Sequence, residues 1–272
     1  MDIKKMLAVG TAIIGTAVTA EGIVSSSVVG YLGNDTRSSG ATMMAGTFAA
    51  VSATDGSYTL GDLTVSGYDA PIYDEDEGET QEGTGVILGQ FNLQFLSSSG
   101  TTEASYNYID DGEHTKGWYD ASWNSANNVV IPAGQAMWIV GRGLTLVSAG
   151  AVETSDIVRP TRSSGATAIG NGTPVDLTLG RLLVEGYEAP IYDEDEGETQ
   201  EGTGVILGQF NVQFLSASGT TEASYNFIDD GEHTKGWYDA SWNSGNAVSV
   251  PAGQGLWIVG RGLSLRVPAP EL

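Results

Sequence analysis

The chain contains one module twice. Residues 67–125 and 186–244 align without a gap over 59 positions, offset by 119, and differ at four of them. The four pairs, none of which changes the charge, are Asp69/Glu188, Leu93/Val212, Ser98/Ala217 and Tyr108/Phe227. A period this long exceeds that of solenoid repeats and fits a tandem pair of small domains. A functional site should therefore occur in both copies, which points away from a conventional single-site enzyme and towards binding, display or assembly.

The upstream part of each module has diverged further. Residues 36–42 reappear as residues 161–167 at an offset of 125, so the first module carries six extra residues before Gly67. Residues 22–27 are echoed by residues 150–155. We therefore expect domains at residues 21–149 and 150–272, with the link between them serving as the first strand of the second domain.

The first 20 residues have the pattern of a secretory signal peptide. Lys4 and Lys5 precede an apolar stretch from Met6 to Ala20, and Val18 and Ala20 supply small residues before a cleavage site at Glu21. The stretch is shorter than the roughly 20 residues that a membrane-spanning helix needs. The pattern predicts an exported protein, secreted or held at the cell surface; an uncleaved membrane anchor is the alternative.

The mature chain is strongly acidic and has no cysteine. Removal of Asp2, Lys4 and Lys5 from 34 acidic and 11 basic residues leaves 33 and 9, a net charge of −24. Such a charge repels nucleic acid and anionic membranes. Cations, basic surfaces and neutral glycans are the partners it permits. Without disulfides, the fold must be held by core burial, metal or assembly.

Strand signals dominate the mature sequence. In residues 86–95, Phe91, Leu93 and Phe95 alternate with polar residues, which predicts a strand with one buried face. Further candidate strands in the first module cover residues 41–51, 58–66, 101–109, 129–131 and 136–146, separated by Gly, Asn, Asp and Pro clusters. This spacing predicts an all-β fold of two tandem β-sandwich or jelly-roll-like domains. Trp138 and Trp257 are expected to anchor the cores.

Runs of carboxylates are the clearest chemical feature. Residues 74–79 hold five carboxylates and a glycine, and residues 193–198 repeat them. The Asp-x-Asp-x-Gly spacing partly matches loops that bind hard cations, and calcium is the one cofactor the sequence indicates. The candidate ligands are Asp74, Asp76, Glu79, Glu82, Asp110, Asp111 and Asp120, with their copies Asp193, Asp195, Glu198, Glu201, Asp229, Asp230 and Asp239. The alternative is a solvated acidic hairpin that keeps the protein soluble.

Catalytic signatures are missing from the sequence. His114 and His233 are the only histidines, and their turn-like surroundings predict exposed polar residues. Neither a Gly-x-Ser-x-Gly elbow nor a His-Glu-x-x-His pair occurs, and the carboxylates lie in runs and not as two isolated groups. We expect no enzymatic activity.

Aromatic residues follow the second acidic turn. They are Trp118, Tyr119 and Trp123, with their copies Trp237, Tyr238 and Trp242. Beside carboxylates such rings could form a platform for sugars, and core packing is the alternative.

Two motifs occur once in each module: Gly-Trp-Tyr-Asp at residues 117–120 and Pro-Ala-Gly-Gln-x-x-Trp-Ile-Val-Gly at residues 132–141. Together they resemble a little-characterised family of secreted bacterial tandem β-domain proteins. The resemblance covers most of the mature chain. It implies an extracellular location and a β-sandwich, and it carries over no catalytic residue.

Two functional hypotheses follow. The first is a secreted structural subunit of an extracellular filament or surface assembly, calcium-assisted, whose copies join head to tail by exchange of the N-terminal strand through Ile23, Val24, Val28, Val29 and Tyr31. The second is an extracellular glycan-binding or adhesion protein with two equivalent modules that gain avidity from the duplication.

Overall fold

A computed structural model describes residues 28–50, 57–97 and 99–271. Within these residues every regular element is a β-strand, apart from two three-residue 3-10 turns, η1 (Leu60–Asp62) and η2 (Leu179–Arg181). All strand pairs are antiparallel, and the prediction of an all-β, sandwich-like fold is confirmed. The expected signal peptide at residues 1–20 lies outside the described residues.

Each repeat builds a three-stranded and a five-stranded sheet. In the first repeat the small sheet has the order β1 (Val29–Asp35), β10 (Thr145–Ala151), β3 (Leu63–Ser66). Its large sheet has the order β2 (Thr42–Ala45), β9 (Ala136–Val140), β6 (Asn92–Leu96), β7 (Thr102–Ile109), β8 (Gly117–Tyr119).

The second repeat follows the same plan. Its small sheet has the order β11 (Ile157–Pro160), β22 (Ser264–Val267), β14 (Leu183–Glu185). Its large sheet has the order β12 (Thr167–Gly170), β21 (Gly255–Val259), β17 (Asn211–Leu215), β18 (Thr221–Ile228), β19 (Gly236–Tyr238). A short pair, β13 (Leu177–Thr178) with β20 (Ser249–Val250), is added. The link between the repeats therefore does supply a strand, β11, to the second repeat.

Alternation along the strands builds a separate core in each repeat. Phe91 and Leu93 are fully buried and Phe95 packs at the edge of the core, as the sequence pattern predicts. The ring of Trp118 meets Phe91 and Tyr108 edge-on, with centroids 5.9 and 5.4 Å away. Edge-to-face contacts of this kind add about 0.5–1.5 kcal/mol beyond area burial.

The prediction of a single strand over residues 136–146 is wrong in one respect, because the structure breaks this segment into β9 and β10. The intervening turn places Arg142 and Gly143 at φ of 48° and 79°. Two successive positive φ values characterise a type I′ turn. Here the turn leads the chain from the large sheet to the small one, because β9 and β10 belong to different sheets. The candidate strand at residues 129–131 is reduced to one bridge between Val130 and Thr59.

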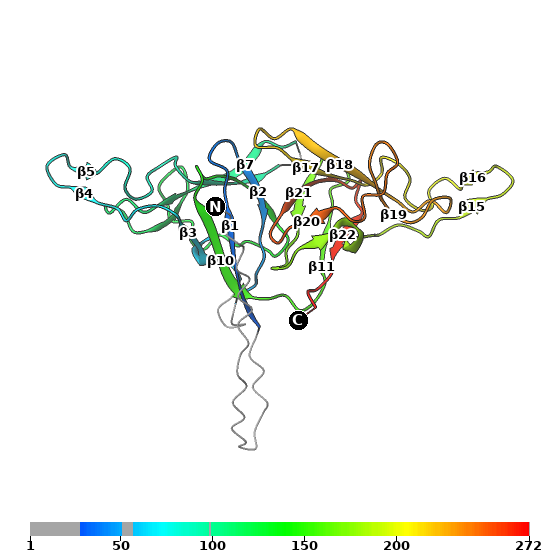
Figure 1. Cartoon of the computed structure of the whole chain (residues 1–272), viewed down its shortest axis with the longest axis horizontal. Helices are drawn as coiled ribbons and strands as arrows, with labels where there is room; N and C mark the ends of the chain where they lie inside the picture. Colours follow the sequence, from blue (N-terminus) through cyan, green and yellow to red (C-terminus); the bar gives the residue numbers. More distant parts are fainter. Residues whose placement is uncertain (1–27, 51–56, 98, 272) are drawn as a thin grey trace, which may run out of the picture.

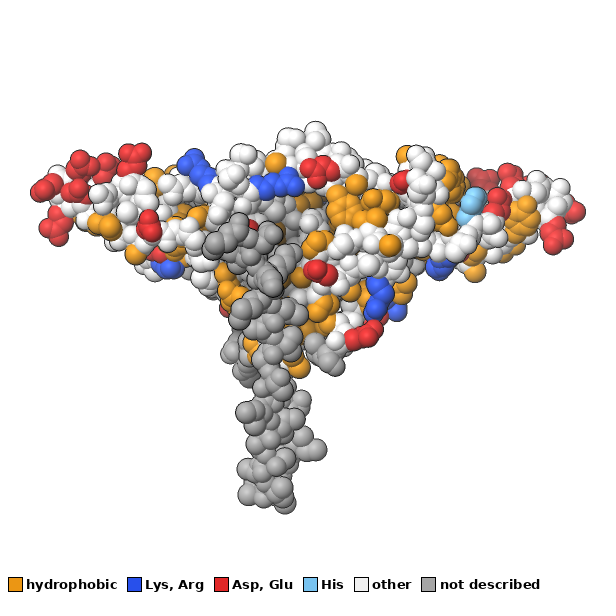
Figure 2. Space-filling view, viewed as in Figure 1, with side chains coloured by type: hydrophobic (Ala, Val, Ile, Leu, Met, Phe, Trp, Pro, Cys, Tyr) orange, Lys and Arg blue, Asp and Glu red, His pale blue; other side chains and the backbone are white. Residues whose placement is uncertain are grey.

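Long arms carry the acidic runs away from the sheets. Their tips are two-residue hairpins, β4 (Tyr73–Asp74) with β5 (Glu79–Thr80), and β15 (Tyr192–Asp193) with β16 (Glu198–Thr199). The arms extend to opposite ends of the molecule (Figure 1), and acidic side chains gather at both ends (Figure 2).

The two repeats pack through equivalent surfaces. A bridge between Met44 and Gln254 is matched by one between Ile169 and Gln135, and Met44 and Ile169 are equivalent positions, as are Gln135 and Gln254. The Ala45 N–H donates to the Gly253 carbonyl at 2.8 Å, and the equivalent Gly170 N–H donates to the Gly134 carbonyl at 3.1 Å. Met43, Ala136 and Ala168 form a small apolar core between the repeats.

This arrangement is a pseudo-two-fold contact. In an isologous contact each partner uses the same patch, so the contact closes on itself. The repeats therefore do not stand in the head-to-tail relation that successive filament subunits would have. β11 pairs with β22 of its own repeat, so this strand does not cross between the repeats.

Candidate functional site

The acidic hairpins are organised by their own backbone. Asp74 Oδ1 accepts hydrogen bonds from the Asp76 and Glu77 N–H groups at 3.0 and 3.3 Å, and Gly78 adopts a φ of 71°. An aspartate that caps the following amides, with a glycine in the left-handed region, is how a short chain closes a tight turn. The aspartate thus has a structural task in the hairpin without a cation.

Asp76, Glu79 and Glu82 are exposed at the hairpin, whereas Asp110 and Asp120 accept hydrogen bonds from protein donors. Asp110 accepts from Lys116 Nζ at 2.8 Å and from the Tyr68 hydroxyl at 2.5 Å. Asp120 accepts from the Ser122 N–H and from Asn124. The same bonds recur around Asp229 and Asp239.

The structure does not gather these carboxylates into a ligand shell. Thr80 at the base of the hairpin donates its hydroxyl to the Asp111 carbonyl, so the arm touches the 110–113 turn. Even so, within the described ranges no group of three or more His, Cys, Asp or Glu side chains is placed to hold a metal ion. Calcium binding stays a prediction; a melting temperature that rises in millimolar calcium and returns with chelator would bear it out.

Two of the predicted aromatic ligand residues are core residues. Trp118 and Trp237 are each 1% exposed. Their strands β8 and β19 pair Trp118 with Tyr108 and Trp237 with Phe227, which turns both indoles inward. The prediction that these two rings present a sugar platform is wrong, and the alternative of core packing holds for them.

Trp123 and Trp242 lie at the surface in a costly backbone conformation. Each is 45% exposed, and their φ angles are 63° and 62°. A bulky residue in the left-handed region is a genuine outlier, and strain of about 1–3 kcal/mol persists only where the surroundings impose it. Asp120 imposes it in the first repeat, because its carboxylate holds the Ser122 and Asn124 amides on either side of Trp123.

Each exposed indole is the centre of an aromatic cluster. The His114 ring stacks on Trp123 with centroids 4.7 Å apart and planes 23° apart, and Tyr119 lies 5.9 Å away at a tilt. We call His114, Tyr119 and Trp123 the Trp123 cluster. The equivalent Trp242 cluster is His233, Tyr238 and Trp242, with the same geometry.

Asp111 fixes the histidine of the Trp123 cluster. Its carboxylate lies 2.8 Å from His114 Nδ1 and accepts the His114 and Glu113 backbone N–H groups at 2.9 and 3.1 Å. Burial acts to raise the pKa of Asp111, and the hydrogen bonds from His114 and Glu113 outweigh it, so that the pKa is lowered. The imidazole is thereby held against the indole.

We expect Asp111→Asn to lower the free energy of unfolding by about 1–3 kcal/mol at neutral pH, because the charged hydrogen bonds weaken. A carboxyl with a lowered pKa contributes stability above its ordinary pKa of about 3.9 and loses it as pH falls through the folded-state pKa. The difference between variant and wild type, measured by urea unfolding, should therefore shrink below about pH 4. A difference that stays constant to lower pH would contradict this account.

A network beside the cluster is structural. Lys116 bonds both Asp110 and the Tyr68 hydroxyl, at 2.8 and 3.0 Å. The hydrogen bond to Asp110 raises the pKa of Lys116, so the amine stays protonated at neutral pH. It acts as a donor that ties the 110–116 turn to Tyr68.

The structure describes only part of the candidate exchange strand. Ile23 and Val24 lie outside the described residues. Val28, Val29 and Tyr31 are exposed, and β1 pairs with β10 of its own repeat along its whole length. The strand is thus already part of the first repeat's small sheet, which corrects the expectation that it is held free for another subunit.

The prediction that Trp138 and Trp257 anchor the cores of the repeats is wrong. They are half-buried and pack at the contact between the repeats, not in the repeat cores. A signal was present: Met137 and Ile139 are the buried positions of β9, and Trp138 falls between them on the opposite face.

Among the described residues there is no helix long and apolar enough to cross a membrane. Comparisons with family models, with curated proteins and with solved structures gave no match to this chain.

Proposed function

We propose that this chain is an extracellular binding protein that holds neutral glycans on its Trp123 and Trp242 clusters. The observation that carries the proposal is the exposed tryptophan kept in a left-handed conformation at the same place in both repeats. Strained residues of this kind concentrate at functional sites. A turn with glycine at this position would close without the strain, so the indole is retained against a conformational cost.

The chemistry of the cluster suits a sugar ring. The C–H face of a pyranose stacks on an indole, and its hydroxyls bond to polar groups at the rim. Asp120 accepts three protein hydrogen bonds, and a carboxylate has about four acceptor positions, so acceptor capacity remains beside Trp123. Stacking of His114 and tilting of Tyr119 fix the indole before a ligand arrives, which lowers the entropic cost of binding.

Two clusters on one rigid chain make the binding bivalent. A second binding event on the same polymer is intramolecular, and avidity can exceed a single-site affinity by about 10²–10⁴. The pseudo-two-fold contact between the repeats supports this view, because it holds the two clusters in a fixed relation.

The test uses immobilised neutral polysaccharides and residues 21–272. Trp123→Ala and Trp242→Ala should each reduce apparent affinity by about 10²-fold through lost avidity, and the double variant should abolish binding. Tyr31→Ala, which removes an exposed ring from β1, is the matched control and should bind as wild type. Undiminished binding by the double variant, or no wild-type binding across a broad glycan array, would refute the proposal.

Self-assembly is a second candidate function, and the edge of β1 favours it. Among the described strands, β1 has one neighbour, β10. The Val152 N–H donates to the Val28 carbonyl at 2.8 Å, and the Thr36 N–H donates to the Leu144 carbonyl at 2.9 Å. Since hydrogen-bonded pairs alternate in an antiparallel ladder, the N–H groups of Val29, Tyr31 and Gly33 point away from β10. They form a row that a strand of another copy could pair with.

Tyr31→Pro tests this assembly without cutting the chain. Proline removes an outward N–H and leaves the bonds to β10 in place, so the variant should stay folded and lose any filaments seen by negative-stain electron microscopy. Deleting residues 21–32 is a poorer test, because it removes half of β1 from its own sheet. Filaments that persist in a folded Tyr31→Pro protein would eliminate edge pairing at β1.

A further inference from the structure

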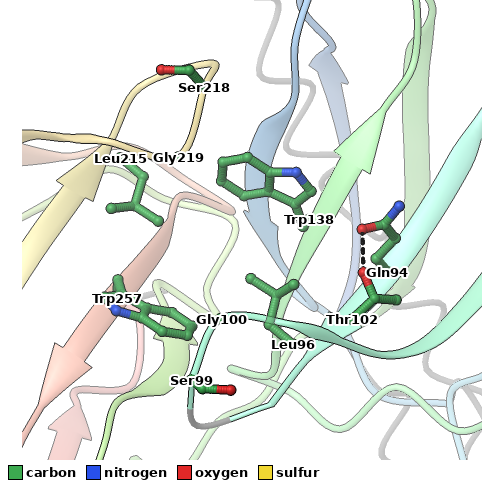
Figure 3. Close-up of a pocket in the computed structure, with 10 residues that line it drawn as sticks. All are labelled: Gln94, Leu96, Ser99, Gly100, Thr102, Trp138, Leu215, Ser218, Gly219 and Trp257. Atoms are coloured by element: carbon green, nitrogen blue, oxygen red, sulfur yellow. Dashed lines mark hydrogen bonds between the residues drawn. The ribbon is translucent and has the colours of Figure 1, made fainter.

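A cleft of about 420 Å³ lies where the two repeats meet (Figure 3). Its volume falls within the range of about 300–1,000 Å³ that is common for small-molecule sites. Eight of the ten lining residues form four pairs related by the pseudo-two-fold, and Gln94 and Thr102 of the first repeat complete the lining. Trp138 faces Trp257, and Ser99 and Ser218 stand at opposite ends of the space. In this view Leu96 and Leu215 lie on opposite sides of the pair of indoles.

The cleft depends on both repeats. The Trp257 ring packs against Gly100 of the first repeat, 3.6 Å from the position that a Cβ atom would take there. The Trp138 ring packs in the same way against Gly219 of the second repeat, also at 3.6 Å. Each indole is therefore held by the opposite repeat's glycine turn, so neither repeat alone would form the site.

The cleft is uncharged in a strongly acidic protein. None of the ten lining residues is ionisable, although the chain has 34 acidic residues. Two glutamates near the lining each form an ion pair with an arginine of the opposite repeat. Glu103 lies 3.7 Å from Arg162, and Glu222 lies 4.0 Å from Arg37. These pairs are exposed and add little stability, but they cancel the local charge. An uncharged site of this kind favours a neutral ligand.

Polar groups are placed around the indoles. Thr102 donates its hydroxyl to Gln94 Oε1 at 2.9 Å, which fixes the amide at one wall. The Ser99 hydroxyl oxygen lies 3.0 Å from that of Ser97 and 3.3 Å from that of Thr101. Since a hydroxyl has one donor and two acceptor positions, one position remains for a ligand. Figure 3 draws the nitrogen of each indole on the side of its ring away from the other indole, so the two rings turn their six-membered parts towards each other.

We propose that this cleft binds one neutral saccharide per chain, at a site separate from the Trp123 and Trp242 clusters. The indoles can stack on the C–H surfaces of a sugar, the hydroxyl and amide groups of the lining can bond its hydroxyls, and the lining carries no charge. Together these features match a neutral pyranose and no ionic ligand. The site goes beyond the proposed function, because it requires the paired repeats and has a different stoichiometry: one ligand per chain against two for the clusters.

The six tryptophans allow the sites to be separated in one experiment. Residues 21–272 are labelled with ¹⁵N-tryptophan, and each indole N–H signal is assigned by a single Trp→Phe variant. Cellohexaose, chitohexaose and maltohexaose are then titrated to millimolar concentration. We expect at least one of them to shift the Trp138 and Trp257 signals with one-to-one stoichiometry, while the buried Trp118 and Trp237 signals stay fixed as internal references.

A second experiment places a charge in the cleft. Ser218→Asp changes an exposed loop residue and should weaken the cleft titration at least tenfold, with the Trp123 and Trp242 signals responding as in wild type. The cleft proposal would be overturned if the Trp138 and Trp257 signals did not shift with any of the three sugars. It would also be overturned if an apolar peptide shifted these signals and the sugars did not. Stationary Trp123 and Trp242 signals would count against the clusters alone, so the two proposals fail independently.

Discussion

Trp237→Ala is expected to lower the free energy of unfolding by about 3–5 kcal/mol, the usual loss when a fully buried aromatic side chain is truncated in a core. The indole is 1% exposed and meets Phe210 and Phe227 edge-on at 6.0 and 5.3 Å. Its Nε1–H donates to the Leu182 carbonyl at 3.3 Å, so truncation also leaves that carbonyl without its partner. Urea unfolding followed by far-UV circular dichroism gives the measurement.

The matched control is Trp242→Ala, five residues along the chain. This indole is 45% exposed, so its loss should cost about 1 kcal/mol or less. Equal losses in the two variants would contradict the assignment of one tryptophan to the core and the other to a surface cluster.

The first repeat refines this prediction. Within the described structure Trp118 Nε1 is buried without a hydrogen-bond partner, in contrast to Trp237. Trp118→Phe therefore removes an unsatisfied donor, and Trp237→Phe breaks a bond. A buried polar group left unpaired costs about 1–3 kcal/mol, so we expect the phenylalanine variant to be tolerated better in the first repeat.

Gly172→Val is expected to force the two repeats apart. A Cβ atom at Gly172 would lie 2.5 Å from the Gly134 backbone nitrogen and 2.9 Å from its Cα, both across the contact between the repeats. Backbone atoms cannot move aside as a side chain can. Overpacking typically costs about 1–3 kcal/mol, and here the contact can relieve it by opening.

Opening should be visible in two ways. Small-angle X-ray scattering should report a larger radius of gyration, and thermal unfolding should change from one transition to two as the repeats lose their mutual support. Gly33→Val is the control, because a Cβ atom there meets only a Thr145 methyl group at 3.5 Å. An unchanged radius of gyration with a single transition would show that the contact adapts to the added side chain.

Much of the fold could be predicted from local pattern. The alternation of Phe91 and Leu93 with polar neighbours placed both in the core, because successive strand residues point to opposite faces. The run around Gly78 was correctly expected to form a turn. The turn at Arg142 was missed, because arginine carries no preference for the positive φ that its type I′ turn requires.

The candidate sites were harder to predict. Trp118 and Trp123 are both aromatic and five residues apart, and only the pairing of β8 with β7 sends one inward. His114 gave no sequence signal for stacking on Trp123, because that contact depends on the turn that Asp120 closes and on the carboxylate of Asp111.

By itself the sequence determined that the chain builds the same all-β unit twice, each around an alternating core, because residue period and turn chemistry act over a few neighbouring residues. Only the tertiary structure decided how the units face each other. The bridges from Met44 to Gln254 and from Ile169 to Gln135 pair residues far apart in the chain, through the shape of two completed sheets. That pairing brings Trp138 and Trp257 to one cleft, because a contact between two folded surfaces depends on both at once.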